Sequence, residues 1–219
     1  MVSRKPPRSR PARRRSVRHD DAGDAACDRI LTAARELFPT RGYHGTGIRD
    51  ITRAARVNLG SVTYHFGSKA ALYHALLNDV TAPLRAGFVA IHDGPGTPLE
   101  KIEAIVRHFF SHVQRHPEMI PLMVREMAGA GDLAPPIRDL LQTVGPIITG
   151  IIAAGQQRGE VRAGDPLLLT LSTMAQPVYL NLSRKGVRTG AGRDPMDQAN
   201  AQATIEHALT MVREMLRKP

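Results

Sequence analysis

The sequence predicts an all-α protein with a small helical domain near the N-terminus and a larger helical domain after it. Apolar residues recur at three- and four-residue spacing in one segment after another, a pattern typical of amphipathic helices. Breaker clusters such as 93–96 and 129–131 separate these segments. With 219 residues and 42% hydrophobic content, the chain can bury a core and is long enough for one or two domains.

The charge and the cysteine content indicate the kind of partner and the cellular compartment that we expect. The formal charge of +10 and the isoelectric point near 10.6 indicate a polyanionic partner. Cys27 is the only cysteine, so no intramolecular disulfide can form, and its place beside Ala34 and Phe38 favours a small buried thiol. No apolar run reaches the roughly 18 residues of a membrane span, and no hydrophobic signal core begins the chain. We therefore expect a cytoplasmic protein without membrane contact.

Residues 1–22 are expected to form a disordered basic arm. The stretch from Met1 to about Arg18 is rich in Arg, Pro and Ser and has no apolar periodicity, so it cannot bury enough surface to offset the entropy of ordering. Two interpretations of the arm remain. Its arginines contact DNA phosphates or a minor groove, or the stretch only solubilises the chain or reflects a wrongly assigned start.

The first helix is predicted from about Ala25 to Thr40, with Gly42 ending it. Its apolar stripe consists of Ala26, Ile30, Ala33, Ala34, Leu37 and Phe38. Acidic residues at 20, 21 and 24 precede it, where the helix dipole favours negative charge. This helix is interpreted as the scaffold for the two helices that follow, with Tyr43 packed near the join.

The stretch 46–72 predicts two short helices joined by a tight turn, followed by the start of a third helix. The first carries an apolar face of Ile48, Ile51 and Ala55. Arg49 and Arg53, four residues apart, lie together on another face. One side of this helix therefore packs, and the other faces an acidic partner.

The second short helix is predicted to present a polar surface to DNA. Asn58 is expected to be its N-cap, because a short polar side chain can accept a hydrogen bond from an unpaired N–H of the first turn. Leu59, Val62 and Phe66 then fall on the packing side. The outward side chains are small, polar and rich in hydrogen-bonding groups: Gly60, Ser61, Thr63, Tyr64 and His65. Such a surface suits a helix that enters a major groove.

These segments resemble the DNA-binding domain of the tetracycline-repressor (TetR) family. The resemblance rests on Gly42-Tyr43, Thr46, residues 51–57, the run Val62-Thr63-Tyr64-His65-Phe66-Gly67-Ser68-Lys69, and Leu72. It covers roughly the first third of the folded chain. Two positions depart from the family pattern. Arg56 stands where the turn usually has Gly, which costs turn stability where φ is positive, and Ala70 stands where an acidic residue often begins the fourth helix.

The resemblance implies a homodimeric, all-helical transcriptional regulator whose C-terminal domain binds a small molecule and thereby controls affinity for a double-stranded DNA operator. It divides the chain into the arm at 1–22, a helix-turn-helix DNA-binding domain at 23–68 and an effector-binding and dimerisation domain at 69–219. It also implies the DNA contacts, which are Arg49, Leu59, Gly60, Ser61 and Thr63 near base edges and Thr46, Tyr64, His65 and Lys69 at phosphates. Leu59 has a second interpretation, as a packing residue at the helix start.

The rest of the chain is predicted to be helical, with the fourth helix joining the DNA-binding domain to the body. The expected helices are 68–92, with Pro83 inside it, 98–115, 118–127, 136–157, 167–182 and 197–217, and a polar loop is expected at 186–195. Ser68 is the predicted N-cap of the fourth helix. Asp165 before Pro166 is typical of an N-cap followed by proline at the first helical position.

An apolar effector pocket is predicted inside the body. Its expected lining is Phe88, Phe109, Phe110, Met123, Met127 and Ile148, which favours a hydrophobic effector. A fully packed core has the same sequence pattern. His108, His112 and His116 recur every four residues, a spacing that can place imidazoles on one metal ion. A solvated helix border is the favoured interpretation, and we expect neither a metal site nor a cofactor.

The last two long helices are predicted to form a dimer interface. Helix 167–182 is apolar almost all round, so it needs cover on two sides. The resemblance places the interface of a four-helix dimer at Leu171, Ala175, Val178, Leu182, Ile205, Leu209, Val212 and Leu216. Two paired DNA-binding domains imply a pseudo-palindromic operator with half-sites spaced near multiples of about 34 Å.

Two other classes of function remain to be weighed against a regulator. A nonspecific DNA-coating protein would use the same helices and the basic arm without any effector. An enzyme is not expected, because the sequence has no Gly-rich phosphate loop and no nucleophile elbow, and its one cysteine lies on a packing face. Repression is the default in the family, although the position of the operator in a promoter decides the sign.

Overall fold

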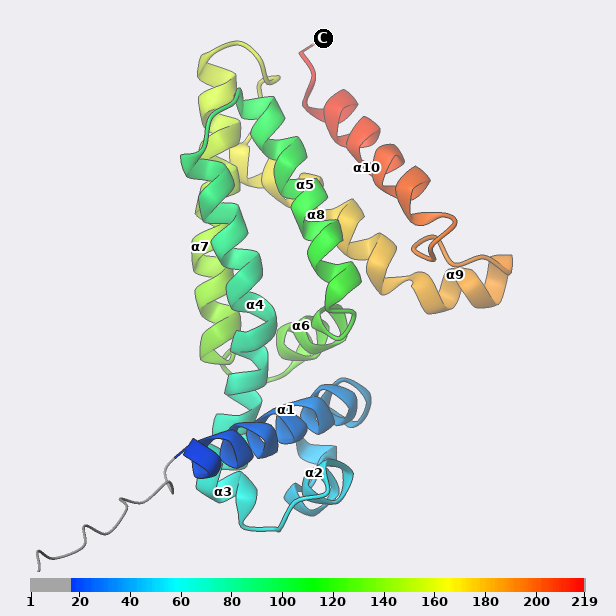
Figure 1. Ribbon diagram of the computed structural model, residues 1–219. Helices are drawn as coiled ribbons and strands as arrows, with labels where there is room; N and C mark the ends of the chain where they lie inside the picture. Colours follow the sequence, from blue (N-terminus) through cyan, green and yellow to red (C-terminus); the bar gives the residue numbers. More distant parts are fainter. Residues whose placement is uncertain (1–16, 219) are drawn as a thin grey trace, which may run out of the picture.

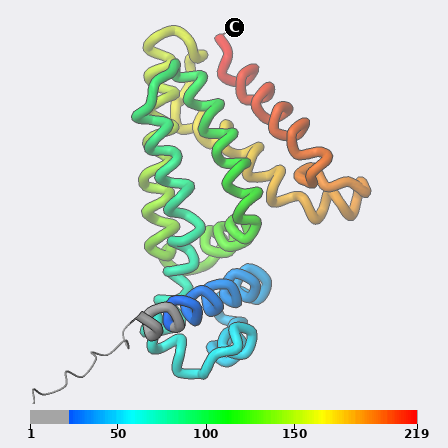
Figure 2. Tube along the Cα trace, in the orientation of Figure 1, coloured from blue at the N-terminus to red at the C-terminus, as the bar shows by residue number. Residues whose placement is uncertain are grey.

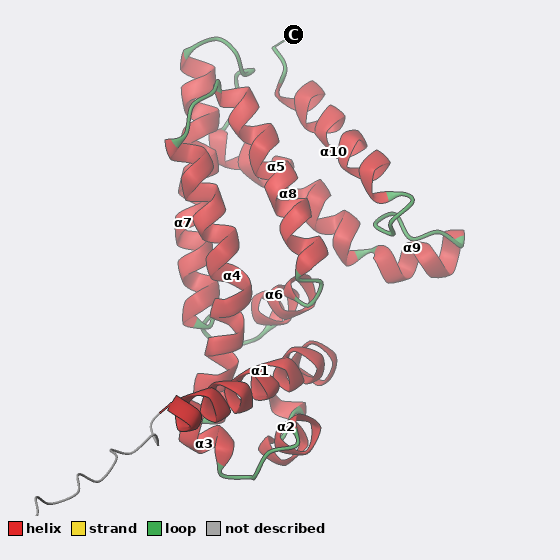
Figure 3. Ribbon diagram, viewed as in Figure 1, coloured by secondary structure: helices red, strands yellow, loops and turns green. Residues whose placement is uncertain are grey.

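The computed structural model describes residues 17–218, with side chains described from residue 23 onward. Loops join its helices, and no strand occurs among the described residues (Figure 3). In chain order the helices are α1 (Val17–Gly45), α2 (Ile48–Ala55), α3 (Ser61–Phe66), α4 (Lys69–Asp93), α5 (Pro98–Arg115), α6 (Met119–Ala128), α7 (Pro135–Gln157), α8 (Pro166–Leu182), α9 (Arg184–Ala191) and α10 (Ala201–Leu216). The predicted all-α fold class is confirmed.

The helices α1, α2 and α3 form a small head around the first turns of α4 (Figure 1). Side chains from all four helices exclude solvent in its core, namely Ile30, Ala34, Phe38, Ile51, Val62 and Leu72. Their mutual burial holds α2 and α3 on the apolar stripe of α1 that the sequence predicted. Cys27, which that stripe predicted as buried, is half-buried.

The remaining helices form a larger body. The helices α4, α5 and α7 pack on one another, α8 packs against α5 and α7, and α10 lies against α5 and α8 (Figures 1 and 2). Large side chains from several helices fill the body core, among them Leu76, Phe88, Ile102, Phe110, Leu122 and Ile152. Since α4 begins in the head and ends in the body, it connects the two mechanically.

Helix α7 is long and apolar enough, by length and composition only, to cross a membrane, and it alone among the described helices passes that test. Core helices of soluble proteins pass it too. Here α7 packs against α4, α5 and α8 and buries Ile137, Leu140, Ile148 and Ile152. These contacts bury part of that apolar helix, since 28% of its most apolar stretch is buried.

The N-terminal boundary of the first helix differs from the prediction. Helix α1 begins at Val17 instead of Ala25, so the disorder predicted for 17–22 is wrong. The residues at 20 and 21 therefore belong to the first turns of α1. The rest of the predicted arm, residues 1–16, lies outside the described residues. At the other end, Gly42 breaks the helical backbone with φ +75°, as predicted.

A short helix occupies residues 186–191 of the polar loop predicted at 186–195, and residues 192–195 are non-helical. Helix α9 has no apolar stripe, which is why periodicity did not indicate it, yet the Val187 N–H donates to the Ser183 carbonyl (2.9 Å) in a regular helical turn. Arg184 braces the segment by bonding both carboxylate oxygens of Asp194. The final helix begins at Ala201 instead of Asp197, because the Asp197 carboxylate caps a separate turn.

The predicted caps of two long helices are confirmed. The Ser68 hydroxyl accepts a hydrogen bond from the Ala71 N–H (3.1 Å) at the start of α4. The Asp165 carboxylate accepts one from the Leu167 N–H (2.8 Å) at the start of α8, with Pro166 at the first helical position. These bonds satisfy donors that have no partner inside the helix.

Candidate nucleic-acid interface

Helix α2 presents two arginines to solvent. Ile51 and Ala55 are buried in the head, which turns Arg49 and Arg53 outward. Asp50 closes the first turn by accepting a hydrogen bond from the N–H three residues earlier (3.3 Å). Its carboxylate also lies 3.9 Å from the Arg53 guanidinium. Exposed guanidinium groups on a firmly anchored helix are suited to a polyanion.

The turn after α2 has the backbone geometry that the sequence predicted to be costly. Arg56 has φ +53° and ψ +49°, and it is the only described residue other than glycine with a positive φ. Two hydrogen bonds close the turn, from the Arg56 N–H to the Arg53 carbonyl (3.2 Å) and from the Val57 N–H to the Thr52 carbonyl (3.0 Å). The turn therefore forms with arginine in a conformation that glycine adopts more easily.

Helix α3 begins later than predicted, and its predicted cap is wrong. The helix starts at Ser61, after a turn in which the Ser61 N–H donates to the backbone carbonyl of Asn58 (2.9 Å). The Asn58 side chain forms no cap, because the chain makes this extra turn before the helix and Gly60 takes the N-cap position. Val62 is fully buried and anchors the helix, and Gly67 ends it with φ +81°.

The outward side of α3 meets the arginine side of α2 across a shallow hollow. This hollow has a volume of about 640 Å³ and is lined by Gly47, Ile48, Arg49, Asp50, Arg53, Leu59 and Thr63. Leu59, whose two interpretations were DNA contact and packing, is 53% exposed. Packing therefore does not account for Leu59. Two cations and one carboxylate line the hollow, so its net charge is positive.

Three of the four predicted phosphate-contacting residues are at least partly exposed, since Tyr64 is exposed and His65 and Lys69 are half-buried. Tyr64 is 84% exposed, and its ring meets that of His65 edge to face at 4.9 Å. The ammonium group of Lys69 lies 4.3 Å from the centre of the Tyr43 ring. This cation–π contact holds Lys69 at the start of α4. Tyr43 is packed against Phe38 and Tyr73, as the sequence predicted.

The fourth, Thr46, has a structural role, and its assignment as a phosphate contact is wrong. Its side chain is fully buried. The hydroxyl donates to the Gly42 carbonyl at 2.8 Å, which satisfies an acceptor freed by the break in α1. A threonine just before a helix could serve either purpose, and only the packing around it distinguishes them.

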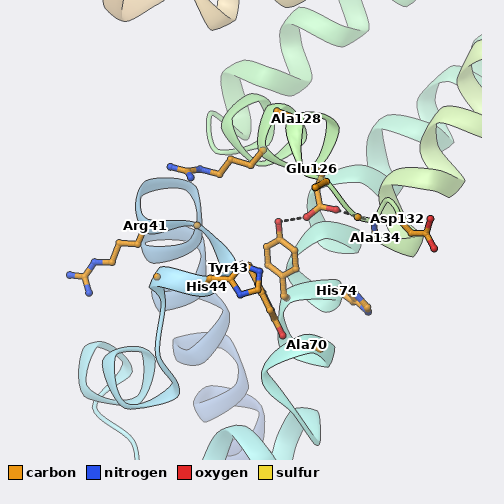
Figure 4. A pocket seen from close by; sticks show the side chains of 16 residues that line it. Arg41, Tyr43, His44, Ala70, His74, Glu126, Ala128, Asp132 and Ala134 are labelled. Atoms are coloured by element: carbon orange, nitrogen blue, oxygen red, sulfur yellow. Dashed lines mark hydrogen bonds between the residues drawn. The ribbon is translucent and has the colours of Figure 1, made fainter.

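A second hollow, of about 710 Å³, lies between the head and the body (Figure 4). Glu126 of α6 accepts hydrogen bonds from the Tyr73 hydroxyl of α4 (2.8 Å) and from the Ala134 N–H at the start of α7 (2.9 Å). Burial, and then this carboxylate, raise the pKa of the Tyr73 hydroxyl. Three helices of the body thus meet at one carboxylate beside the head.

Arg125, next along α6, bonds the end of α1. Its guanidinium donates to the carbonyls of Pro39 (3.1 Å) and Thr40 (3.0 Å). These contacts between head and body were missed at the sequence level. The residues involved are separated by up to 86 positions, and neither periodicity nor a motif pairs them.

Most of the residues predicted for the effector pocket cluster in the body core. Phe88, Phe109, Phe110 and Ile148 are buried, and Met123 is half-buried. Met127 is 60% exposed at the end of α6, so it does not line an enclosed cavity in this structure. The two hollows described above do not include these residues.

The three histidines of α5 differ in environment. His112 is fully buried, and its Nε2 donates to the Val80 carbonyl of α4 (2.7 Å). His108 packs edge to face on Phe88 and is half-buried. His116 stacks on His112 with ring centres 4.5 Å apart. Among residues 23–218, no three His, Cys, Asp or Glu side chains converge as metal ligands. His112 is therefore a core residue, not part of a solvated border.

The residues predicted for the dimer interface divide into two groups. On α8, Leu171, Ala175 and Leu182 are exposed and Val178 is half-buried. On α10, Leu209, Val212 and Leu216 are buried within the chain and Ile205 is half-buried. Ion pairs from Arg213 to Glu103 and from Arg107 to Glu206 hold α10 on α5. The apolar side of α10 therefore belongs to the core of the chain, and its assignment to the interface is corrected.

Sequence comparisons match both parts of the chain. The family model described as "Bacterial regulatory proteins, tetR family" matches residues 30–76, and the one described as "Tetracyclin repressor-like, C-terminal domain" matches residues 98–212. The chain is similar to the HTH-type transcriptional repressor NicS of Pseudomonas putida, with 28% identity over 153 residues, 68% of this chain and 72% of that protein. It is also similar to the HTH-type transcriptional regulator RutR of Escherichia coli, with 26% identity over 189 residues, 86% of this chain and 89% of that protein.

A solved structure shares the fold over both domains. The crystal structure of AibR in complex with isovaleryl coenzyme A and operator DNA has a TM-score of 0.70 and 19% identity, and the match covers 85% of this chain and 97% of that one. At this level of identity the likeness concerns the fold alone.

Proposed function

Because this chain belongs to the tetracycline-repressor (TetR) family of bacterial regulatory proteins, it is a DNA-binding transcriptional regulator, and we propose that it represses from a pseudo-palindromic operator as a homodimer until a small apolar effector releases it. The observation that carries the proposal is the polar, exposed side of α3 beside the arginines of α2. A helix of this width fits a major groove. Such a regulator acts in the cytoplasm, where the DNA is.

The residues of this surface divide into two roles. Arg49 can bond the O6 and N7 atoms of guanine, and Thr63 and Ser61 can use hydroxyl groups at base edges. Leu59 offers an exposed apolar group for a thymine methyl, and Gly60 has no neighbour within 4 Å of where a Cβ would stand, so a backbone can approach it closely. Tyr64, His65 and Lys69 are assigned to phosphates, which fix the register.

An operator with two-fold symmetry requires two copies of the head. The exposed apolar side of α8 is suited to pair with a second copy of the chain, which would place the heads on successive major grooves about 34 Å apart. NicS is named a repressor, which supports repression as the mode of action here.

Effector control requires that the ligand bind one state of the dimer better than the other. A ligand with equal affinity for the DNA-bound and released forms shifts nothing. The core cluster around Phe109 and Phe110, with half-buried Met123 beside it, supports an apolar effector. The complex of AibR with isovaleryl coenzyme A and operator DNA supports the same arrangement of a small ligand and DNA on this fold.

Selection of DNA from a random pool at physiological salt tests the proposal. The protein is expected to enrich an inverted repeat, Arg49→Ala is expected to lose preference at defined bases, and a chain lacking residues 1–16 is expected to enrich the same repeat. Arg158→Ala, an exposed arginine at the far end of α7, serves as the matched control and should behave as the parent.

The alternative function gives a different result. A nonspecific DNA-coating protein would enrich no sequence, and bulk DNA would compete fully, whereas an operator reader keeps a preference of roughly a thousandfold or more. Residues 1–16 hold seven of the 30 Lys and Arg residues. If those cations carried the binding, their deletion would abolish it and flatten its salt dependence.

A further inference from the structure

A third hollow, of about 290 Å³, lies where the end of α5 meets α6, the end of α8 and α9. Figure 1 places these four segments together on the side of the body away from α7. It shares no lining residue with the DNA surface or with the junction between head and body, and of the residues predicted for the dimer interface only Leu182 lines it.

The floor of this hollow is apolar and continuous with the body core. Val113 is 2% exposed and Ile120 is 3% exposed, and both line it. Val113 lies one helical turn after Phe109 on the same face of α5. The rings of Phe109 and Phe110 meet edge to face at 6.3 Å in that core. An apolar group that displaces the floor therefore reaches the cluster assigned to the effector.

The wall of the hollow is basic and comes from α9. Arg184, Lys185 and Arg188 line it together with one acidic residue, Asp194. Arg184 bonds both oxygens of Asp194 at 3.0 and 2.9 Å, and this contact holds the pKa of the Asp194 carboxyl below its usual value. Asp194 also accepts from the Met196 N–H (2.9 Å), which fixes the wall in place.

Lys185 and Arg188 remain without a close ion pair among the described residues after that pairing, and the charge of Arg188 adds to that of Arg184 in lowering the pKa of Asp194. Neither Lys185 nor Arg188 forms an ion pair with any acidic residue in the part of the chain that the structure describes. Both side chains are exposed at the rim, next to a floor without charge. A neutral apolar ligand would cover these cations without giving them a partner, whereas an anionic group would bond them.

We propose that this hollow binds the anionic group of an acyl effector, with Lys185 and Arg188 holding a carboxylate or phosphate and the acyl chain entering the core past Val113 and Ile120. This inference rests on the proposed function, because it assigns the class of effector for the same body. Carboxylate and phosphate groups share the required chemistry, so the source is either a free fatty acid or an acyl-coenzyme A thioester.

Calorimetric titration of the full-length protein tests this assignment. The probes are butanoyl-, octanoyl- and dodecanoyl-coenzyme A, the three matching carboxylates, and coenzyme A alone. At least one acyl probe is expected to bind. Replacing both rim cations, Lys185→Gln with Arg188→Gln, is expected to weaken that binding roughly tenfold or more. Arg193→Gln removes an exposed cation just beyond α9 that does not line the hollow, and it should change affinity less than twofold.

Several results would overturn the assignment. These are no binding of any acyl probe, unchanged affinity in the double variant, or coenzyme A alone binding as tightly as its thioesters. Dependence on Lys185 and Arg188 for the carboxylates identifies a fatty acid, and dependence for the thioesters alone identifies the coenzyme A form.

The operator selected above separates this inference from the proposed function. The double variant at Lys185 and Arg188 and the Arg193→Gln control should both bind that operator as the parent does in the absence of probe, which also shows that they fold. If an operator is enriched but no acyl probe binds, the result contradicts only the inference of an acyl effector. If no operator is enriched, the result contradicts the proposed function, whether or not a probe binds in the hollow.

Discussion

Arg56 is the residue at which local sequence and backbone geometry conflict most directly. Its left-handed conformation costs an ordinary residue about 1 kcal/mol or more, and glycine adopts it freely. The turn persists because Val57, Ile51 and Val62 on either side pack into the head. The strain lies between the two helices of the DNA-binding motif.

Replacing Arg56 by glycine is expected to raise the free energy of unfolding by up to about 1 kcal/mol, since relief of strain exceeds the added entropy of the unfolded chain. Urea denaturation followed by circular dichroism measures the change. Arg56→Ala is the control, because it removes the side chain and keeps the strain. Equal stability of both variants would show that the turn is not strained.

His112 makes stability depend on pH. Burial lowers its pKa to about 4, and the neighbouring His116, Arg115 and His108 act in the same direction, while the bond to the Val80 carbonyl opposes them. Its Nδ1 has no hydrogen-bond partner among the described residues. A proton added there would be buried without an acceptor.

Because the folded pKa lies below the unfolded one, the neutral ring stabilises the fold fully above about pH 6.5, and this contribution is lost as the pH falls toward 4. The loss is on the order of 3 kcal/mol. His112→Gln should remove this part of the pH dependence in urea titrations at several pH values. His207→Gln, an exposed histidine on α10, should leave it unchanged. Identical pH profiles for the parent and His112→Gln would contradict the assignment.

At the scale of elements, α6 links the head to the body. Its Arg125 bonds the end of α1, and its Glu126 joins α4 to the start of α7. Lys69, assigned to a phosphate, contacts Tyr43, whose ring lies 5.2 Å from that of Tyr73. Helix α6 therefore makes hydrogen bonds on both sides of the junction.

Tyr73→Phe is expected to destabilise the protein by about 1 to 3 kcal/mol, because it leaves the part-buried Glu126 carboxylate with one donor fewer. Thermal and urea unfolding measure this loss. Tyr43→Phe is the matched control, since the Tyr43 hydroxyl makes no hydrogen bond to another described residue. A smaller effect at Tyr73 than at Tyr43 would mean that the Glu126 bond contributes nothing.

At the scale of the whole molecule, α8 leaves an apolar surface uncovered. Leu168, Leu171 and Tyr179 are 60, 59 and 66% exposed, and they recur at three- to eight-residue spacing along one side of the helix. Apolar surface of this extent on one helix is typical of an interface. We therefore expect the dimer interface to involve α8, because the apolar side of α10 packs within the single chain.

Leu171→Glu is expected to convert the dimer to a monomer with a nearly unchanged fold, as measured by analytical ultracentrifugation and circular dichroism. Leu141→Glu, on an exposed position of α7, should remain dimeric. Leu209→Ala, in the buried face of α10, should instead lower stability by about 2 to 5 kcal/mol. A dimeric Leu171→Glu would exclude this face of α8 from the interface.

The sequence by itself determined the helices of the DNA-binding motif and the direction in which most of their side chains point. Some features depend on only a few neighbouring residues, so they can be predicted from the sequence alone. These are the helical spacing, the Ser68 cap and the break at Gly42. Helix α9 was not predicted from the sequence, because it has no apolar stripe. Asn58 failed as a cap because an additional turn precedes α3.

Only the tertiary structure decided which neighbour a residue contacts when its side chain could serve either in packing or in binding a partner. The Thr46 hydroxyl could have bonded a phosphate, but it is buried and donates instead to the Gly42 carbonyl at the end of α1. The apolar residues of α8 and α10 look alike in sequence, yet α5 covers one set and leaves the other exposed. Arg125 and Glu126 find partners up to 86 positions away. Such pairings depend on how whole helices pack, because local chemistry sets a helix and its faces but does not select the neighbour that covers them.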